Sequence, residues 1–304
     1  SGTKDDYSIT VTGYAQYQVI DDQGTDGTDT LNNIETLRFS DQELDISPSG
    51  QIITGTEDHD QIDGGVGADS ISGLAGNDAL KGLGGDDEIY GGDGDDLIEG
   101  GEHNDTIYGG SGMDNISGGE GSDTIFGGIG DDTIYAFSSQ NPSDYIDWSK
   151  EPTKDILYGG EGNDNLRGFR GSTIYGEEGD DYISSENMSS ANDPTSGAIA
   201  YGGIGDDYIT LSNPALIDGG DGDDTIELRG SGPYEMVLRP ISITGGTGYD
   251  TLTISNWYPH WDRISNFEEI IIDGGTRVFS DDLTQPGTTL KIRTAHAHEN
   301  VNFD

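Results

Sequence analysis

The sequence GGIGDDTIY, residues 127–135, is the last of nine consecutive nine-residue units that fill residues 55–135 without an insertion. Earlier units read GGVGADSIS, GGDGDDLIE and GGSGMDNIS. The sixth position of every unit is aspartate: Asp60, Asp69, Asp78, Asp87, Asp96, Asp105, Asp114, Asp123 and Asp132. The eighth position is always isoleucine or leucine: Ile62, Ile71, Leu80, Ile89, Ile98, Ile107, Ile116, Ile125 and Ile134. A period held this strictly indicates a repeat architecture in which every unit adopts the same local structure.

Each unit combines a turn with a short strand. Glycines allow positive φ and close approach of the backbone, so the first six residues can form a tight turn. The last three residues, x-Ile-x, suit a strand whose central side chain points inward and whose neighbours point outward. A stack of such strands would bury a continuous ladder of Ile and Leu, which is too thin to hold the fold alone. Carboxylate and carbonyl oxygens around a tight turn suit a hard cation, so they favour Ca²⁺ over Zn²⁺.

These units resemble the glycine-rich nonapeptide G-G-x-G-x-D-x-U-x of bacterial RTX, or hemolysin-type calcium-binding, proteins. The resemblance implies an all-β fold, a right-handed parallel β-roll (RTX β-solenoid) in which two units make one coil. It also implies calcium between stacked turns, held by the aspartates of units n and n+2 and by backbone carbonyls. One edge would then hold Asp60, Asp78, Asp96, Asp114 and Asp132, and the other Asp69, Asp87, Asp105 and Asp123. If every gap is filled, this block binds about seven ions.

Two units depart from the consensus. The unit GTEDHDQID, residues 55–63, lacks glycine at positions two and four, and the unit GGEHNDTIY has His103 where glycine is usual. We expect weaker sites at these turns.

Beyond residue 135 the repeat is interrupted but not lost. Matching turns contain Asp164, Asp181, Asp207, Asp224 and Asp250, at spacings of 17, 26, 17 and 26 residues. Because one full coil is two nine-residue units, we expect these five turns to stack on a single edge. The opposite edge loses the motif at residues 168–175 and 211–218. We therefore expect roughly four further calcium ions, on the order of ten in all, along one edge and variable loops along the other.

Three insertions, residues 136–158, 185–201 and 228–244, are the least repetitive part of the chain. The first carries Phe137, Tyr145 and Trp148. These aromatic side chains either fold back over the flank of the roll or form a loop that stacks on a sugar or binds a partner.

The overall composition is that of a disordered chain unless a cation neutralises it. Among 304 residues there are 59 Asp and Glu against 13 Lys and Arg, a formal net charge of −46, and 31% of residues are hydrophobic. Such a charge makes nucleic acid and anionic membranes poor partners. No apolar stretch approaches the roughly 20 residues of a membrane helix, and the absence of Cys excludes disulfides. About ten bound Ca²⁺ ions would reduce the formal charge to roughly −26.

The sequence predicts four segments. They are an N-terminal β capping segment (1–54), the regular nine-repeat calcium roll (55–135), an interrupted roll (136–255) and a C-terminal β cap (256–304). Residues 7–46 read as strands around a turn at 24–27, and we expect them to cover the first open coil. In the last segment we expect short strands without aspartate turns, which form either a calcium-free end of the same roll or a small β cap. We expect the core to be closed there by Phe267, Ile270, Ile271, Ile272 and Phe279.

The sequence predicts no enzyme, because it has no G-x-S-x-G, no H-E-x-x-H and no cysteine nucleophile. One open alternative is polysaccharide processing on a face of the solenoid that carries Trp257, Trp261 and Asp262. The pair His296 and His298 fits an exposed tail or a transition-metal site. The dipeptide Asp193-Pro194 is similar, in those two residues only, to the self-cleaving bond of some RTX proteins.

The resemblance implies a calcium-binding module of a secreted bacterial protein that leaves the cell by type I secretion. The chain would be unfolded at low cytosolic calcium and would fold on extracellular calcium. Because it starts at Ser1 with no Met or signal peptide, we expect a fragment of a larger toxin, adhesin or exoenzyme. Its role would be that of a structural spacer or folding module beside neighbouring modules. The alternative is a binding module whose insertion loops recognise a polysaccharide or a cell surface.

Overall fold

The computed structural model describes residues 7–13, 16–21, 28–32, 36–38, 43–45, 50–137, 154–169, 171–185, 197–211, 214–229, 242–255, 264–273, 277–279, 291–294 and 301–303. These residues form strands and turns, and none of them is helical. The all-β prediction is therefore confirmed for the described part of the chain.

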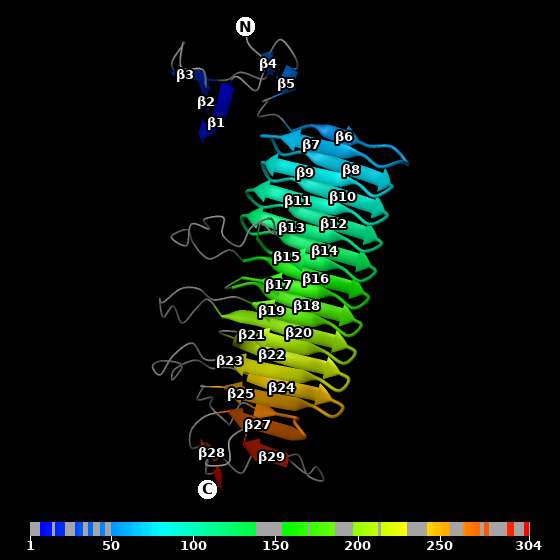
Figure 1. The fold of residues 1–304 in the computed structure, drawn as a ribbon, viewed down its shortest axis with the longest axis vertical. Helices are drawn as coiled ribbons and strands as arrows, with labels where there is room; N and C mark the ends of the chain where they lie inside the picture. The colour runs from blue at the N-terminus through cyan, green and yellow to red at the C-terminus, as the bar shows by residue number, and fades with distance from the viewer. Residues whose placement is uncertain are drawn as a thin grey trace.

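Most of the described residues form one stack of coils in which two parallel sheets face each other (Figure 1). The even-numbered strands from β6 to β26 form an 11-stranded sheet, the even sheet, and the odd-numbered strands from β7 to β29 form a 12-stranded sheet, the odd sheet. The even sheet contains β6 (Ile52–Thr54), β8 (Ser70–Ala75), β10 (Glu88–Asp93), β12 (Thr106–Ser111), β14 (Thr124–Ile129), β16 (Ile156–Glu161), β18 (Thr173–Glu178), β20 (Ala198–Ile204), β22 (Pro214–Asp221), β24 (Ser242–Thr247) and β26 (Ile264–Ser265). The odd sheet contains β7 (Gln61–Gly65), β9 (Ala79–Gly84), β11 (Leu97–Glu102), β13 (Asn115–Glu120), β15 (Thr133–Tyr135), β17 (Asn165–Gly168), β19 (Tyr182–Ser185), β21 (Tyr208–Leu211), β23 (Thr225–Arg229), β25 (Thr251–Ser255), β27 (Glu269–Asp273) and β29 (Lys291–Thr294).

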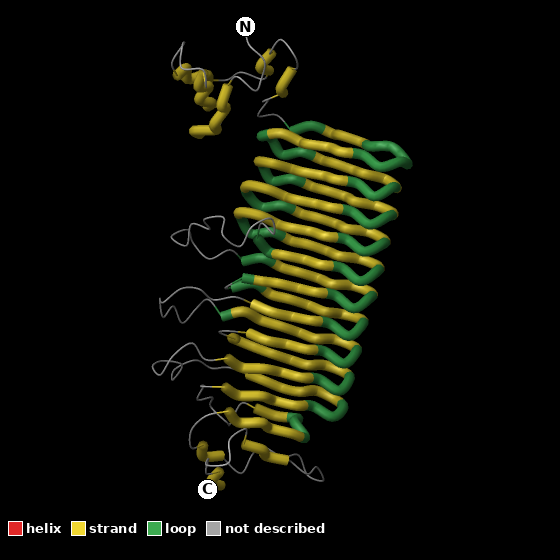
Figure 2. The backbone as a smooth tube through the Cα atoms, in the orientation of Figure 1, coloured by secondary structure: helices red, strands yellow, loops and turns green. Residues whose placement is uncertain are grey.

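The strand register follows from the nine-residue period. In the regular block each residue pairs with the residue 18 positions later, as Ile89 does with Ile107 and Ile98 with Ile116. Two units therefore complete one coil, with one unit in each sheet, as the sequence predicts. The turns between the strands lie along the two edges of the stack (Figure 2).

The strands are longer than the sequence analysis predicts. In β10 the strand includes not only Glu88, Ile89 and Tyr90 but also Gly91, Gly92 and Asp93, the first three residues of the following unit. The prediction that each strand contains only the three residues x-Ile-x is therefore wrong, because glycines at positions one and two extend the strand before the chain turns. At position two the glycines have positive φ, 122° at Gly92, which a side chain would strain.

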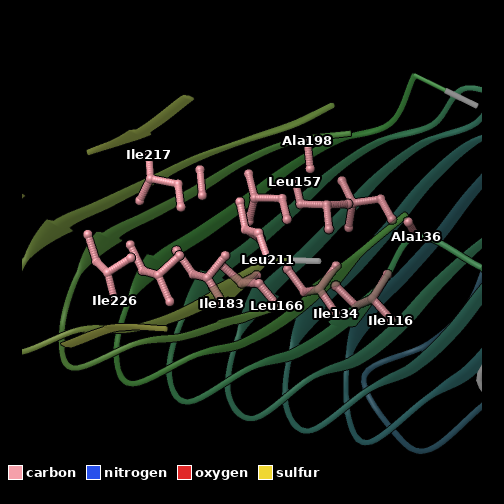
Figure 3. Close-up of a cluster of buried hydrophobic side chains, with 14 of the residues drawn as sticks. Ile116, Ile134, Ala136, Leu157, Leu166, Ile183, Ala198, Leu211, Ile217 and Ile226 are labelled. Carbon is pink, nitrogen blue, oxygen red and sulfur yellow. The ribbon is translucent and has the colours of Figure 1, made fainter. Parts of the chain in front are cut away.

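The core is a pair of apolar ladders between the two sheets (Figure 3). Strand residues alternate between inward and outward, and the eighth residues of the regular units are 0–9% exposed. In the later coils the odd sheet gains a second inward apolar position, occupied by Leu211, Leu228 and Ile254, each at most 1% exposed. The core is therefore wider in these later coils than in the regular block.

A row of stacked aromatic rings runs along the outer face of the even sheet. It consists of Tyr90, Tyr108, Phe126, Tyr158, Tyr175 and Tyr201. Neighbouring ring centroids are 4.7–4.9 Å apart and neighbouring planes differ by 3–5°. Since these residues are aligned in register, the strand spacing itself brings the rings face to face.

The N-terminal strands predicted between residues 7 and 46 are present. β1 (Tyr7–Gly13), β2 (Gln16–Asp21) and β3 (Thr28–Asn32) form an antiparallel sheet, and β4 (Thr36–Arg38) pairs with β5 (Glu43–Asp45). The predicted turn at 24–27 lies outside the described residues.

At the other end of the stack, β26, β27 and β29 continue the two sheets. A separate two-stranded pair is formed by β28 (Arg277–Phe279) and β30 (Val301–Phe303). Phe267 and Ile270 are buried in the core as predicted, at 3% and 1% exposure. The prediction that Ile271 lies in the core is wrong, because Ile271 is only half-buried, at the outward position between Ile270 and Ile272. The side chains of Ile272 and Phe279 lie outside the described part.

Candidate metal centre

The repeat aspartates form two columns, one along each edge of the stack. In each column the backbone N–H of one aspartate donates to the Oδ1 atom of the aspartate in the next coil. The continuous column has nine such steps of 2.7–3.0 Å and contains Asp60, Asp78, Asp96, Asp114, Asp132, Asp164, Asp181, Asp207, Asp224 and Asp250. The short column has four steps of 2.7–3.1 Å and contains Asp69, Asp87, Asp105, Asp123 and Asp155.

The predicted arrangement of the aspartates on the two edges is confirmed. The five late turns, from Asp164 to Asp250, continue the column that begins at Asp60. Their turns form the uninterrupted row along one edge of the stack in Figure 2. The breaks in the described chain between β15 and β26 all fall where an odd strand leads to the next even strand. The short column therefore lies on the edge that carries the insertions.

The second carboxylate oxygen of these aspartates is the unusual feature of the site. Among the described residues, the Oδ2 atom is buried without a hydrogen-bond partner in Asp78, Asp87, Asp96, Asp105, Asp114, Asp123, Asp132, Asp164, Asp181, Asp207, Asp224 and Asp250. A buried charged oxygen without a partner is costly, because it has lost its hydration and gained nothing in return. Each of these atoms is therefore placed to bind a cation.

Glycine at position one makes room for a second oxygen at each step. A side-chain carbon on Gly64 would lie within 2.8 Å of both the Asp69 Oδ2 atom and the Gly82 carbonyl oxygen of the next coil. The same two kinds of oxygen converge at Gly73, Gly82, Gly91, Gly100, Gly109, Gly127, Gly159, Gly176, Gly202 and Gly219. Two acceptors that face each other repel unless a positive charge lies between them.

The pKa values of the column aspartates reflect the same cost of burying carboxylates without a partner. Burial raises the pKa of Asp105 and of Asp181 to about 8, and neighbouring aspartates in the column raise it further. Burial likewise raises the pKa of Asp123, Asp132, Asp207 and Asp224 to about 7. For Asp87, Asp114, Asp164 and Asp250 the pKa rises to about 6. Without a cation these carboxyls bind protons far more readily than ordinary aspartates.

Hydroxyl groups donate hydrogen bonds to the column aspartates at two ends of the columns. At the first turn the half-buried Asp60 accepts hydrogen bonds at Oδ2 from the Thr56 N–H at 2.5 Å and the Thr56 hydroxyl at 2.9 Å. At the last aspartate of the short column, the buried Ser172 hydroxyl donates to the Asp155 Oδ2 atom at 3.2 Å. Thr56 stands at the second position of its unit, where most units have glycine. The departure of this unit from the consensus therefore supplies a neutral partner for its aspartate.

The other unusual unit keeps the turn geometry. His103 has a φ of 88°, the left-handed conformation that glycine adopts at the same place in other turns. Such a conformation is unfavourable for a residue with a Cβ, so the repeat imposes it on His103.

Asp155 is a column member that the sequence analysis misses, because it counts residues 136–158 as an insertion. Asp155 is 1% exposed and occupies the aspartate position before β16. The signal was present in the sequence, since residues 155–160 read DILYGG, as Asp-x-Ile-x-Gly-Gly does in regular units. The other insertion limits are also too wide, because Ser185, Ala198, Leu228 and Ser242 belong to strands.

A second ladder of hydrogen bonds joins the residues at position five, and it is also not among the sequence-based predictions. The side chain of Asn77 accepts from the N–H of Asp95, and Asp95 accepts from the N–H of Met113 at 2.9 Å. The pattern recurs from Asp131 through Asn163, Asp180, Asp206 and Asp223 to Tyr249. These exposed side chains accept from the following coil, whereas the position-six aspartates accept from the preceding coil. The frequent Asn and Asp at position five are the signal that could have revealed it.

Beyond Ser172 small residues replace the aspartates of the short column. Strand register places Ala198 and Ala215 at the sixth position, two residues before Ala200 and Ile217. On the same edge Leu211 and Leu228 are buried one strand position beyond the outward residue, where regular units have glycine. Apolar side chains thus take the place of the carboxylate and glycine pair, so this edge of the later coils does not call for a cation.

The donor set of the columns fits calcium. No three His, Cys, Asp or Glu side chains converge in the part of the chain that the structure describes. Each step instead offers carboxylate oxygens and main-chain carbonyls, the oxygen ligands that Ca²⁺ takes in numbers of six to eight. The sequence-predicted residues are thus brought together in pairs, and Asp155 joins them.

Several other predicted features lie outside the described residues. These are Tyr145, Trp148, Asp193, Pro194, Trp257, Trp261, Asp262, His296 and His298. Phe137 is described and packs edge-on against Tyr135 and Phe169, with centroids 6.3 Å apart in both pairs. It therefore folds back against the roll. Among the described residues, no helix has the length and hydropathy needed to cross a bilayer.

Comparison with known proteins agrees with this geometry. Residues 50–80, 81–114, 108–136, 153–172, 172–187 and 216–230 match the family model described as RTX calcium-binding nonapeptide repeat (4 copies). A search of curated proteins finds no match to the chain. The matched segments include all of the short column and the turns that begin the continuous column. The chain therefore carries RTX calcium-binding nonapeptide repeats.

Proposed function

We propose that this calcium-binding module is a folding switch in a larger secreted protein. At the low calcium of the bacterial cytosol the chain stays unfolded, which suits passage through a narrow type I secretion channel. At the higher calcium outside the cell the columns form and the chain folds. The folded roll then acts as a stiff extracellular spacer, or as a folding module for neighbouring parts of a toxin, adhesin or exoenzyme. Its role in this proposal is structural rather than catalytic.

The observation that carries the proposal is the set of buried Oδ2 atoms without a partner in the two columns. Bound calcium would supply the positive charge that these oxygens lack. The chain itself has only 13 Lys and Arg for 59 Asp and Glu, so it cannot supply that charge from its own side chains. Because the columns exist only in the folded state, cation binding and folding are one equilibrium. We expect about ten ions at saturation.

Far-ultraviolet circular dichroism of the whole chain tests this coupling. Titration with Ca²⁺ should convert a disordered spectrum into a β spectrum, and excess chelator should reverse the change. Titration with Mg²⁺ is the matched control, since Mg²⁺ prefers near-octahedral geometry and gives up its water reluctantly. A full β spectrum in excess chelator would contradict the folding switch, whatever the number of ions bound.

A binding module is the second hypothesis. The outward-facing row of aromatic residues, from Tyr90 to Tyr201, is the feature of the described surface that favours this hypothesis. In that row, however, each ring covers the face of the next, so the rings present edges and hydroxyls. Sugars pack against exposed aromatic faces, which this row offers only at its two ends. We therefore place polysaccharide or surface binding, if the chain has it, on the insertion loops, and glycan-array binding of the calcium-loaded chain tests it.

A further inference from the structure

The continuous column does not end at its last repeat aspartate. Asp250 is 1% exposed, and its N–H donates to the Oε2 atom of Glu268 at 2.9 Å, as each earlier aspartate N–H donates to the next aspartate. The Oδ2 atom of Asp250 is buried without a hydrogen-bond partner. The Asp250 N–H thus bonds to a carboxylate of the next coil, although that coil has no repeat motif.

The carbonyl oxygen that completes each earlier step is present here as well. A side-chain carbon on Gly245 would collide with both the Asp250 Oδ2 atom and the Asn266 carbonyl oxygen. In the regular steps the corresponding carbonyl belongs to a glycine at position one. Asn266 takes the place of that glycine, because Thr244 pairs with Ser265 in the strand register.

The local sequence explains how a different turn builds the same set of oxygens. Strand pairing aligns Leu252 with Ile270, so Glu268 stands opposite Asp250. Only three residues, 266–268, lead from β26 to β27, whereas six residues connect the aligned positions one coil earlier. Asn266 reverses the chain with a φ of 58°, a conformation that asparagine tolerates. Phe267, which lies between Asn266 and Glu268 in the sequence, is 3% exposed and packs in the apolar core. The longer side chain of glutamate then reaches the position that an aspartate occupies in other coils.

We propose that Asp250, the Asn266 carbonyl and Glu268 form a further divalent-cation site that closes the continuous column. The site takes the same hard cation as the repeats, with oxygen donors from a turn outside the nonapeptide pattern. This inference rests on the proposed binding of calcium by the columns.

Native mass spectrometry of the calcium-saturated chain tests the site. Glu268→Gln keeps an oxygen that can accept the Asp250 N–H but removes the charge, so we expect one ion fewer than in the unaltered chain. Glu102→Gln, which removes a carboxylate from the exposed last residue of β11, is the matched control and should keep the full count. An unchanged ion count in Glu268→Gln overturns the inference. If the unaltered chain binds no calcium at all, the proposed function fails instead.

A measurement on the unaltered chain covers the case in which Glu268→Gln does not fold. A crystal grown with calcium should show an ion between Asp250 and Glu268. Ions in the steps from Asp78 to Asp250 together with none between Asp250 and Glu268 would overturn the inference while leaving the proposed function intact.

Discussion

At the scale of single residues, each position-six aspartate serves two neighbouring coils. The Oδ1 atom of Asp96 accepts the N–H of Asp78 in the preceding coil, whereas its Oδ2 atom faces the following coil. Asp95, the adjacent residue in the turn, is exposed and bonds only to position-five neighbours. Adjacent acidic residues in one turn therefore have different roles, and only one of them is placed to bind a buried cation.

Replacing Asp96 with alanine should lower the number of bound calcium ions by about two, because both flanking steps lose a carboxylate oxygen. Asp95→Ala should leave the number unchanged, although it removes a hydrogen bond to Met113. Native mass spectrometry at saturating calcium measures both. Equal ion numbers in the two variants would contradict the assignment of position six as the ligand position.

A substitution at Ser172 should have the opposite effect and add a calcium ion. Its hydroxyl satisfies Asp155, so the short column ends there without needing a cation. Ser172→Asp removes that donor and adds a carboxylate at the aspartate position, so we expect one additional calcium ion. Ser172→Ala is the control, since it removes the donor without adding a ligand and should bind no extra ion. The prediction fails if the aspartate variant folds with calcium and keeps the original ion count.

At the scale of strands and turns, much of the structure follows from the period. A fixed nine-residue repeat places Ile89, Ile107 and Ile125 in one ladder and fixes the register of every pair in the regular block. The single-edge stacking of the late turns follows from spacings close to one coil. The strand length does not follow, because glycine has a weak strand propensity by itself and extends β10 only through pairing with its neighbours. Asp155 was hidden because the preceding insertion breaks the count.

Other features of the site depend on contacts that the repeat pattern does not encode. Thr56 and Ser172 act as hydroxyl partners only because the fold brings them to Asp60 and Asp155. Glu268 stands opposite Asp250 only because the strand register and a shorter turn place it there. Sequence spacing predicts which residues repeat. The hydrogen-bond partners of the residues that differ at the ends of a column are known only from the folded structure.

The apolar edge of the later coils should behave differently from the aspartate columns. Leu211 is 1% exposed and lies on the edge where carboxylates are absent. Leu211→Ala should lower the free energy of unfolding of the calcium-saturated chain by about 2–5 kcal/mol, the usual cost of a cavity in a core, without changing the ion count. Leu97→Ala is the control, because Leu97 is 42% exposed. Denaturant unfolding at fixed calcium measures the difference, and a loss of ions in Leu211→Ala would contradict the prediction.

At the scale of the whole molecule, the columns couple folding to pH as well as to calcium. Burial raises the pKa of Asp105 and Asp181 to about 8 from the ordinary value of 3.8. Between about pH 4 and pH 8 the folded chain therefore binds more protons than the unfolded chain. In the absence of calcium, the free energy of unfolding must rise as the pH falls through this window and decrease again as the pH rises.

We expect the calcium-free chain to gain β structure as the pH is lowered from 8 to about 4.5. Protons and calcium compete for the same oxygens, so the apparent calcium affinity should decrease over the same range. Circular dichroism in excess chelator and calorimetric titration at each pH measure the two effects, with sedimentation to exclude aggregation. A calcium-free chain that is more folded at pH 8 than at pH 5 would contradict the prediction.

The coils contain different numbers of residues, and this difference should determine how the molecule responds to tension. Coils contact only their neighbours in the stack, so a chain pulled from its ends should peel away one coil at a time. An 18-residue coil, such as the one from Asp96 to Asp114, would release roughly 60 Å of extended chain. The 26-residue coil from Asp181 to Asp207 would release roughly 85 Å, and the 32-residue coil from Asp132 to Asp164 roughly 105 Å. Single-molecule pulling in calcium should therefore give a series of unequal steps, in which the insertions act as length markers along the chain.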